Sequence, residues 1–193
     1  METELCKIAY KYGTDKCPKL AEDNNGGHTY TPVYYDFLKD KGDVKKVLEI
    51  GIGSRESMNW NPEHHQVGAS LKMWRDFFPE AHIYGVDIDE TAIFQDDRIT
   101  TYKLDSTRGG DISWLFKQTG TDFDVVIDDG SHRTYDQLRT FRLIFPHLKK
   151  DALYFIEDSK HPEGIIEKLS EYDCLLYAPY PKTQNNLIII RKR

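Results

Sequence analysis

Residues 47–53 read Val47-Leu48-Glu49-Ile50-Gly51-Ile52-Gly53, a short apolar run that ends in two closely spaced glycines. A run of this kind is typical of a parallel strand, because such a strand is covered by apolar side chains on both faces. Glycines at its end let the backbone turn tightly and approach a ligand where a Cβ atom would clash. The stretch therefore predicts a buried strand that leads into a ligand-binding turn, although a tight turn without a ligand would use the same glycines.

Short β-rich segments alternate with helical patterns along the chain after residue 44. The expected strands cover residues 46–50, 82–87, 99–104, 123–128, 152–157, 172–178 and 187–191. The expected helices between them cover residues 69–78, 112–118, 135–146 and 162–170. This alternation predicts an α/β protein with a doubly wound, Rossmann-like, mostly parallel sheet. Residues 179–186 are too few for a parallel crossover, so we expect the last two strands to form an antiparallel hairpin.

Residues 1–44 precede the first expected strand. Residues 3–12 and 32–41 have helical patterns, whereas residues 13–30 are polar and contain glycine. Aromatic side chains gather near the end of this segment, at Tyr30, Tyr34, Tyr35 and Phe37. Because aromatic residues are scarce in disordered segments, we expect residues 1–44 to dock as a helical lid. Residues 45–193 would then form the catalytic domain.

The composition argues against several classes of protein. A chain of 193 residues can bury a substantial core, and its net charge of −6 argues against a broad nucleic-acid surface. No apolar stretch approaches the roughly 18 to 20 residues of a membrane span, and the acidic N-terminus differs from a secretory signal. Cys6, Cys17 and Cys174 form no CxxC pair, which argues against a zinc site and suits a reducing compartment. We therefore expect a cytoplasmic protein that binds neither nucleic acid nor a membrane.

Acidic residues that follow two expected strands indicate a nucleoside ligand. The glycine turn lacks a third glycine, because position 56 is Glu56, so it suits S-adenosylmethionine, which has no phosphate, better than a pyrophosphate. Asp87 ends the second strand, where a carboxylate can accept hydrogen bonds from both ribose hydroxyls. Asp105 follows the third strand and is placed to meet the adenine amino group. Each could be a strand-end cap, but together they favour one shared cofactor site.

A second acidic group is expected where two later strands end. Asp128 ends one expected strand and Asp129 follows it, and Glu157 ends the next and Asp158 follows it. Neighbouring parallel strands lie about 4.8 Å apart, so these carboxylates should crowd together and repel one another. A hard divalent ion bound by oxygen ligands and water would relieve the repulsion, and Mg²⁺ suits such a site. Solvent-exposed acids without an ion are the alternative. His132, on the same loop, is a candidate general base, although a lone histidine is usually structural.

Beyond these motifs, the sequence resembles a known family. The matching stretches are residues 11–16, 30–32, 47–53, 70–74, 78–79, 85–88, 126–132, 143–148 and 154–158. They resemble the metal-dependent sugar O-methyltransferases of macrolide biosynthesis, of the macrocin and mycinamicin type, and more distantly the cephalosporin-tailoring methyltransferase. The macrolide enzymes are class I S-adenosylmethionine-dependent methyltransferases, whose parallel sheet ends in an antiparallel hairpin. The pairing of Ile127–His132 with Ile156–Asp158 is the specific part of the resemblance.

The resemblance implies roles for particular residues. Mg²⁺ would be held by Asp129, Glu157 and Asp158, and His132 would be the catalytic base. The candidate residues for S-adenosylmethionine are Tyr30, Glu49, Gly51, Gly53, Ser70, Asp87, Asp105 and Asp128. The expected reaction is methyl transfer to a hydroxyl of a sugar or sugar-containing small molecule, and the family also implies a homo-oligomer. A catechol-type diol O-methyltransferase and a non-catalytic S-adenosylmethionine-binding subunit are the alternatives.

Two departures from the family pattern concern the acceptor. The macrolide enzymes have a long aromatic-containing segment after Ile-Glu-Asp, whereas here Ser159–Pro162 lead almost at once into an expected helix. We also expect this chain to lack the additional amino-terminal domain of some relatives. The acceptor could therefore be a sugar on a nucleotide, a glycan or a natural product. Asn59–His65 are a candidate wall of its pocket, with His64 and His65 expected to be solvated.

Overall fold

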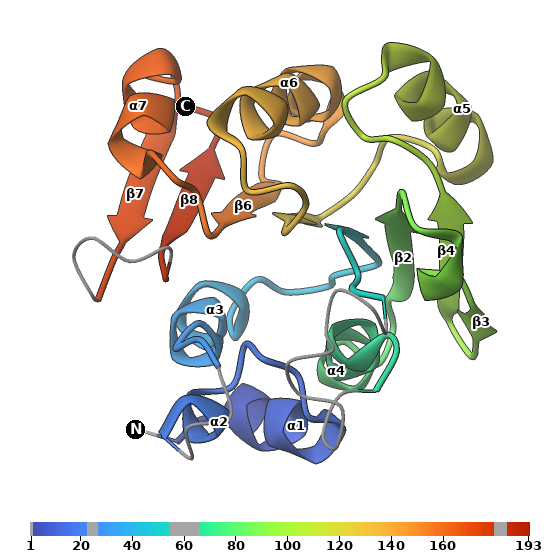
Figure 1. Cartoon of the computed structure of the whole chain (residues 1–193), viewed down its shortest axis with the longest axis vertical. Helices are drawn as coiled ribbons and strands as arrows, with labels where there is room; N and C mark the ends of the chain where they lie inside the picture. The colour runs from blue at the N-terminus through green and yellow to red at the C-terminus, as the bar shows by residue number, and fades with distance from the viewer. Residues whose placement is uncertain (1, 23–26, 55–65, 180–184) are drawn as a thin grey trace.

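A central β-sheet organises the computed structural model of the chain, which describes residues 2–22, 27–54, 66–179 and 185–193 (Figure 1). The strands are β1 (Lys46–Ile50), β2 (His82–Asp87), β3 (Gln95–Asp96), β4 (Ile99–Lys103), β5 (Val125–Asp128), β6 (Leu153–Glu157), β7 (Asp173–Tyr177) and β8 (Leu187–Arg191). Their order across the sheet is β3-β4-β2-β1-β5-β6-β8-β7. Strands β4, β2, β1, β5 and β6 are parallel, whereas β8 is antiparallel to β6 and β7 is antiparallel to β8. The Rossmann-like sheet and its carboxyl-terminal hairpin are thus confirmed.

Strand β3 is an addition to the expected set. It pairs antiparallel with β4 through Gln95 and Asp96. Both residues are exposed and polar, so no apolar periodicity marks the strand in the sequence.

The chain changes direction across the sheet at β1, which has β2 on one side and β5 on the other. Ligands bind in the crevice outside the carboxyl ends of the strands at such a switch point. Gly51 follows β1 directly and has a φ of 78°, and a Cβ atom there would lie 2.1 Å from the Asp129 carbonyl oxygen. Only glycine lets the chain leaving β1 pass so close to the chain leaving β5.

Helices cover both faces of the sheet in a three-layer arrangement (Figure 1). One face carries α1 (Glu4–Tyr12), α2 (Pro18–Glu22), α3 (Thr31–Leu38) and α4 (Ala69–Phe77); the other carries α5 (Gly109–Thr119), α6 (Thr134–Ile144) and α7 (Pro162–Lys168). Short 3₁₀ turns lie at Glu90–Ala92 and Phe145–His147. All the expected helices are present, and α2 is an additional short one. Helix α6 ends before Pro146, because proline lacks the N–H that a continuing helix needs.

The strands divide their side chains between two cores. Val47 of β1 and Phe155 of β6 belong to the core beneath α1, α3 and α4, whereas Leu48 and Ile156 belong to the core beneath α5, α6 and α7. This division follows from the alternation of side chains along a strand. Glu49 shares the face of Val47 by the same alternation, and Glu157 shares that of Phe155. Both glutamates therefore point toward the amino-terminal helices.

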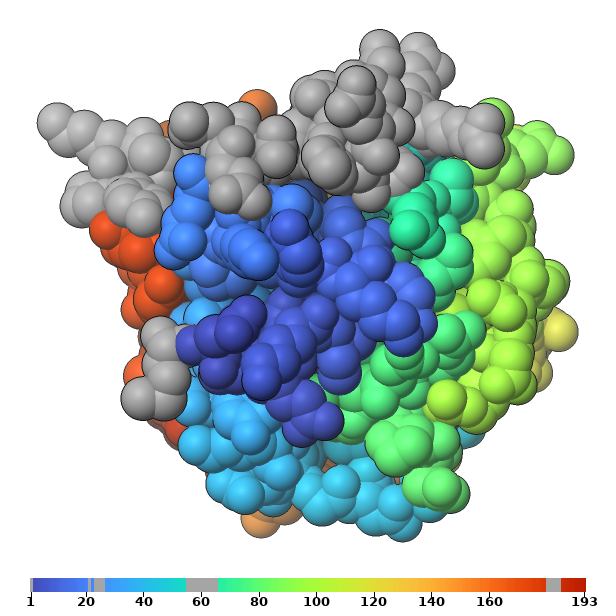
Figure 2. Space-filling model, turned by 90° about the horizontal axis from the view of Figure 1, so that it is seen from below, coloured from blue at the N-terminus to red at the C-terminus, as the bar shows by residue number. Residues whose placement is uncertain are grey.

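The amino-terminal segment is part of the first core. Helix α1 begins at a Thr3 cap, whose side chain accepts a hydrogen bond from the Cys6 N–H, and it ends at Gly13 with a φ of 70°. The Tyr34 ring of α3 lies 5.0 Å from Trp74 of α4 and 4.7 Å from Phe155 of β6. Figure 2 shows the amino-terminal residues, in blue, lying against the green surface of α4. The expected docking of this segment is observed, and its role as a lid stays a prediction.

Among the described residues, no helix combines the length and the apolar character that crossing a membrane would require.

Candidate active site at the carboxyl edge of the sheet

A cavity of about 800 Å³ opens where β1, β2, β4, β5 and β6 end. The predicted site residues in its lining are Gly51, Gly53, Asp87, Asp105, Asp128, Asp129, His132 and Asp158. Glu49 and Ser70 instead line a neighbouring cavity of about 30 Å³, together with Lys16. Tyr30 and Glu157 line neither cavity and are fully buried behind the site. The sheet therefore brings most of the predicted residues to one edge. Some of them line the main cavity, and the others lie behind it.

Backbone N–H groups hold the two acids expected to bind a nucleoside. Asp87 accepts hydrogen bonds from the N–H of Ile52 at 3.0 Å and of Asp89 at 2.9 Å, one on each oxygen. Asp105 accepts one from the N–H of Thr107 at 2.9 Å. Since a carboxylate has about four acceptor positions, each acid keeps capacity for a ligand while its orientation is fixed.

Glu49 is a buried carboxylate inside β1. Its Oε2 accepts a hydrogen bond from the Trp74 indole at 2.6 Å, and its Oε1 lies 3.9 Å from the Lys16 ammonium. Burial raises the pKa of Glu49 to about 7, against the opposing effects of Lys16 and of a Ser70 hydrogen bond. Glu49 therefore lies too deep in the protein to contact a ligand in the main cavity.

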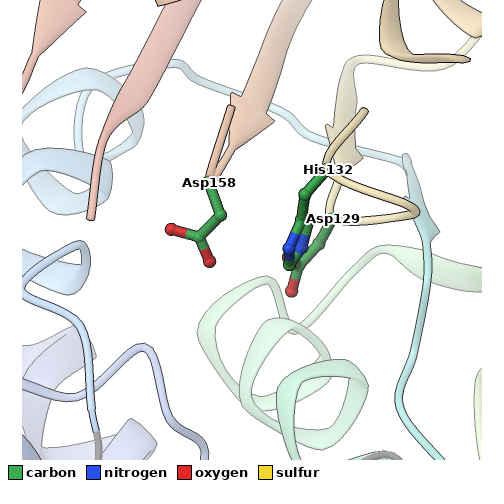
Figure 3. A group of neighbouring side chains, drawn as sticks. All are labelled: Asp129, His132 and Asp158. Atoms are coloured by element: carbon green, nitrogen blue, oxygen red, sulfur yellow. The ribbon is translucent and has the colours of Figure 1, made fainter. Parts of the chain in front are cut away.

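Asp129, His132 and Asp158 form the group that faces the main cavity (Figure 3). Each offers one ligand atom, and these atoms all lie within 4.8 Å of one another. His132 has a φ of 57° and Asp158 a φ of 54°, a left-handed conformation that costs a non-glycine residue of order 1–3 kcal/mol. Backbone strain thus accompanies the placement of two of the three side chains.

The charges of this group are strongly coupled. The His132 Nε2 lies 3.0 Å from Asp129 Oδ1. Burial opposes the charged form of both groups, but Lys16 and His132 together lower the pKa of Asp129 to about 2, and Asp129 raises the pKa of His132. Burial, with the nearby charge of Asp129, raises the pKa of Asp158 to about 6. The arrangement therefore favours an imidazolium beside Asp129, which is the state that a base reaches after it accepts a proton.

The amino-terminal segment supplies further partners for these acids. The Lys16 ammonium lies 2.6 Å from Asp129 Oδ2 and 2.8 Å from Glu157 Oε2. Burial by itself would lower the pKa of Lys16, but Asp129, Glu157 and Glu49 raise it well above its usual range, so the side chain is an ammonium. The Tyr34 hydroxyl donates to Glu157 Oε1 at 2.5 Å.

Asp158 has its own partners from the same segment. The Tyr30 hydroxyl donates to Asp158 Oδ1, and the His28 Nε2 lies 3.3 Å from Asp158 Oδ2. The His28 ring also stacks on Tyr30 at 4.9 Å and lines the main cavity. Tyr30 therefore orients Asp158 from behind rather than lining the pocket.

Sequence reasoning missed Lys16 and His28 as site residues. Lys16 ends the stretch of residues 11–16 that matches the family pattern, and this match was the available signal for it. His28 lies in a stretch that the sequence marks only as polar, so nothing separated it from a solvated histidine. The candidate acceptor wall, Asn59–His65, with His64 and His65, lies outside the described residues.

The donor set facing the cavity fits a divalent ion. Mg²⁺ is usually held by one or two carboxylates and completes its octahedron with water, and Asp129 and Asp158 offer two carboxylates here. Glu157, the third predicted ligand, instead has its oxygens directed to Lys16 and Tyr34. Its role as a ligand stays a prediction.

Comparison with curated proteins finds sugar O-methyltransferases. The chain is 39% identical over 157 residues to demethylmacrocin O-methyltransferase of Streptomyces fradiae. It is 34% identical over 156 residues to mycinamicin VI 2''-O-methyltransferase of Micromonospora griseorubida. Each match covers 80% of this chain and 36% of the relative, so the chain spans about a third of these relatives' length. No family model matches the chain.

Solved structures show the same likeness. The MycE methyltransferase of the mycinamycin pathway, in complex with Mg, SAH and mycinamycin VI, superposes with a TM-score of 0.74 at 27% identity, covering 99% of this chain and 54% of MycE. The SAH-bound Podospora anserina methyltransferase PaMTH1 superposes with a TM-score of 0.59 at 12% identity over 99% of this chain and 88% of its own, which supports the fold alone. The resemblance to the macrolide sugar O-methyltransferases, expected from the motifs, is confirmed.

Proposed function

We propose that this protein transfers a methyl group from S-adenosylmethionine to a hydroxyl of a sugar-bearing small molecule, assisted by Mg²⁺. The observation that carries the proposal is the single cavity that contains both Asp87 and Asp105 and the group Asp129, His132 and Asp158. The likeness to sugar O-methyltransferases over 80% of the chain supports it.

The cofactor would occupy the end of the cavity near β1, β2 and β4. Asp87 would accept hydrogen bonds from the ribose hydroxyls, and Asp105 would meet the adenine amino group. Gly51 and Gly53 would let the backbone approach the cofactor, with Asp128 beside them. The walls of the site would be fixed from behind the main cavity by Glu49, Ser70 and Tyr30.

The acceptor hydroxyl would lie near Asp129, His132 and Asp158. A sugar hydroxyl is a poor nucleophile because it holds its proton tightly; a divalent ion at Asp129 and Asp158 would supply Lewis-acid stabilisation of the developing alkoxide. His132 would take the proton, and Asp129 would stabilise the resulting imidazolium through the contact at 3.0 Å. Much of the acceleration would come from positioning, because the acceptor oxygen, methyl carbon and sulfur must be in line.

Two features of the whole protein belong to the same proposal. Residues 1–44 would act as a fixed inner wall and lid, since Lys16, His28, Tyr30 and Tyr34 all contact acids of the site. The protein would be a cytoplasmic homo-oligomer, an idea supported by its free cysteines and by the family resemblance.

A mass-spectrometric screen tests the proposal. The full chain is incubated with S-adenosylmethionine and Mg²⁺ against sugars, nucleotide sugars, sugar-bearing natural products and catechols, and products are examined for the mass of one added methyl group. We expect a sugar-bearing product that disappears in EDTA and with Asp129→Asn, while the exposed control Asp97→Asn behaves as wild type. Methylation of catechols alone would change the acceptor class, and S-adenosylhomocysteine binding without any turnover would indicate a binding subunit.

A further inference from the structure

The chain leaving β6 passes through a residue with an unfavourable backbone conformation. Strand β6 ends at Glu157, which lies opposite Leu187 of β8 in the antiparallel register. The next residue, Asp158, has a φ of 54°, a left-handed conformation that is unfavourable for a residue with a Cβ atom. Its carboxylate lines the main cavity beside Asp129 and His132 (Figure 3). Because a side chain follows the direction of its backbone, the turn at Asp158 determines where this carboxylate points.

Asn186, the residue before β8, contacts this turn through both its backbone and its side chain. Its carbonyl oxygen accepts hydrogen bonds from the Asp158 N–H at 2.9 Å and from the Tyr30 hydroxyl at 3.0 Å. Its side-chain Oδ1 accepts from the Ser159 N–H at 3.2 Å, and its Nδ2 donates to the Ser159 carbonyl oxygen at 2.9 Å. The Asn186 amide thus pairs with Ser159 as the peptide group of a neighbouring strand would, and it fixes the backbone directly after Asp158.

The hydrogen bonds of Asn186 lie in the protein interior. Asn186 and Ser159 are each 1% exposed. A buried N–H or C=O group that loses its partner carries the full cost of its desolvation. An asparagine side chain offers a donor and an acceptor on one short, planar group, whereas an apolar residue offers neither. Without the Asn186 amide, the backbone of Ser159 would have to find other partners, and the left-handed turn at Asp158 would lose its support.

We propose that Asn186 is a positioning residue for the metal site, whose side-chain amide holds the turn after β6 so that the Asp158 carboxylate points into the main cavity. The inference rests on the proposed function for the presence of Mg²⁺ at Asp158. Asn186 lines neither of the two cavities described above, so it acts through Asp158 and is assigned no contact with either substrate. The carboxyl-terminal hairpin then has a role in metal binding as well as in the fold.

The test measures metal binding without turnover. Mn²⁺ is titrated into the full chain without S-adenosylmethionine, and free Mn²⁺ is followed by electron paramagnetic resonance. We expect Asn186→Ala to bind Mn²⁺ at least about tenfold more weakly than wild type, because Asp158 then faces the cavity in only a fraction of the molecules. The affinity for S-adenosylhomocysteine, measured by titration calorimetry, should stay at the wild-type level, since Asp87 and Asp105 belong to β2 and to the loop after β4.

Two controls separate this role from a general loss of stability. Ser159→Ala removes the hydroxyl that accepts from the His161 N–H at 3.3 Å, but it leaves the backbone groups that Asn186 binds. Thr119→Val removes a buried hydroxyl at the end of α5, which donates to the Leu115 carbonyl oxygen at 3.0 Å and is not part of the lining of the main cavity. Both controls should bind Mn²⁺ as wild type does, even if urea unfolding shows that they lose as much stability as Asn186→Ala.

A milder variant keeps the test decisive if Asn186→Ala does not fold. The hydroxyl in Asn186→Ser can keep one of the two side-chain hydrogen bonds to Ser159 but not both, so this variant should bind Mn²⁺ at least about threefold more weakly than wild type. Wild-type Mn²⁺ affinity in a folded Asn186 variant would overturn the proposal. An equal weakening in Ser159→Ala or Thr119→Val, or an equal loss of S-adenosylhomocysteine affinity, would also overturn it, since the effect would not be specific to Asp158.

The outcomes also separate this proposal from the proposed function. If wild type methylates a sugar with Mg²⁺ and Asn186→Ala keeps its Mn²⁺ affinity, the proposed function stands and the role of Asn186 fails. If Mn²⁺ binding weakens as expected but no acceptor is methylated, the role of Asn186 stands and the proposed function fails. If wild type binds no Mn²⁺, the metal part of the proposed function and the role of Asn186 both fail.

Discussion

The two ends of β5 carry aspartates in opposite electrostatic conditions. At the amino end, Asp124 accepts hydrogen bonds from the N–H groups of Lys45 at 2.8 Å and Lys46 at 2.9 Å, and from the Lys149 ammonium at 2.6 Å. Burial opposes its charge, but these donors lower its pKa. At the carboxyl end, Asp128 has longer contacts, from the Gly130 N–H at 3.3 Å and the Tyr154 hydroxyl at 3.2 Å. Burial, with the charge of Asp129, raises its pKa to about 7.

The amino end of β5 therefore contributes to stability, whereas its carboxyl end belongs to the candidate active site. The hydrogen-bond donors to Asp124 named above are groups of the protein itself, so they are present whether or not a ligand is bound. The acids at the carboxyl end are crowded, and His132 and Asp158 beside them have left-handed backbones. Residues with strained backbones or crowded charges are concentrated at functional sites, so the stability that they cost must come from the rest of the fold. Substitutions at the two ends should therefore have separable effects.

The largest expected effect is on turnover, at the carboxyl end. His132→Ala removes the proposed base and should lower the rate of methyl transfer by roughly 10² to 10⁴, the usual span for general-base catalysis. The midpoint of thermal unfolding and the affinity for S-adenosylhomocysteine should stay near wild type, since His132 is partly exposed. Initial rates at saturating S-adenosylmethionine measure the effect, with His82→Ala, far from the cavity, as the control. A wild-type rate for His132→Ala would assign the base to another group.

A smaller effect is expected on cofactor binding, at the end of β2. Asp87→Ala should weaken S-adenosylhomocysteine binding by about 2 to 4 kcal/mol, from the loss of hydrogen bonds to two ribose hydroxyls. This corresponds to roughly 30- to 1,000-fold in Kd by titration calorimetry. Asp97→Ala, on an exposed turn, should leave the Kd unchanged. Binding of NAD in place of S-adenosylhomocysteine would contradict the cofactor assignment.

Much of the fold and part of the candidate site could be predicted from the sequence. The strands and the carboxyl edge were predictable, because buried parallel strands are continuous apolar runs and their ends share one edge. The acids that line the main cavity, including Asp87, Asp129 and Asp158, were predictable because each ends or directly follows one of those strands. Glu157 was predicted as a site residue, but its contact with Lys16 was not, since the two residues are 141 positions apart in the chain and meet through the docking of the amino-terminal segment. A lysine is mostly exposed in proteins, so residue type alone gives no reason to expect a buried one, and the family match of residues 11–16 was the available signal for Lys16.

The smallest expected effect is on stability, at the amino end of β5. Asp124→Asn removes the charge that the Lys45 and Lys46 N–H groups and Lys149 share, and should lower the free energy of unfolding at neutral pH by about 1 to 3 kcal/mol. Urea unfolding measures this change, and S-adenosylhomocysteine binding should stay at the wild-type level. Lys149→Met is the matched control, because it removes only the ammonium, which is 38% exposed and should contribute about 0 to 1 kcal/mol. An equal loss in both variants would mean that the backbone donors add nothing.

The pH dependence of that loss identifies its cause. The pKa of Asp124 is lowered in the folded chain, whereas in the unfolded chain it should be about 3.9. The stability that its charge contributes is therefore fully present above about pH 4 and is lost as the pH falls below that value toward the folded pKa. The difference in unfolding free energy between wild type and Asp124→Asn should be constant near neutral pH and should shrink below about pH 4. Other carboxylates titrate in both proteins and their contributions cancel, so the difference between the two unfolding free energies reports on Asp124. A difference that persisted undiminished in acid would mean that the packing of Asp124, rather than its charge, stabilises the amino end of β5.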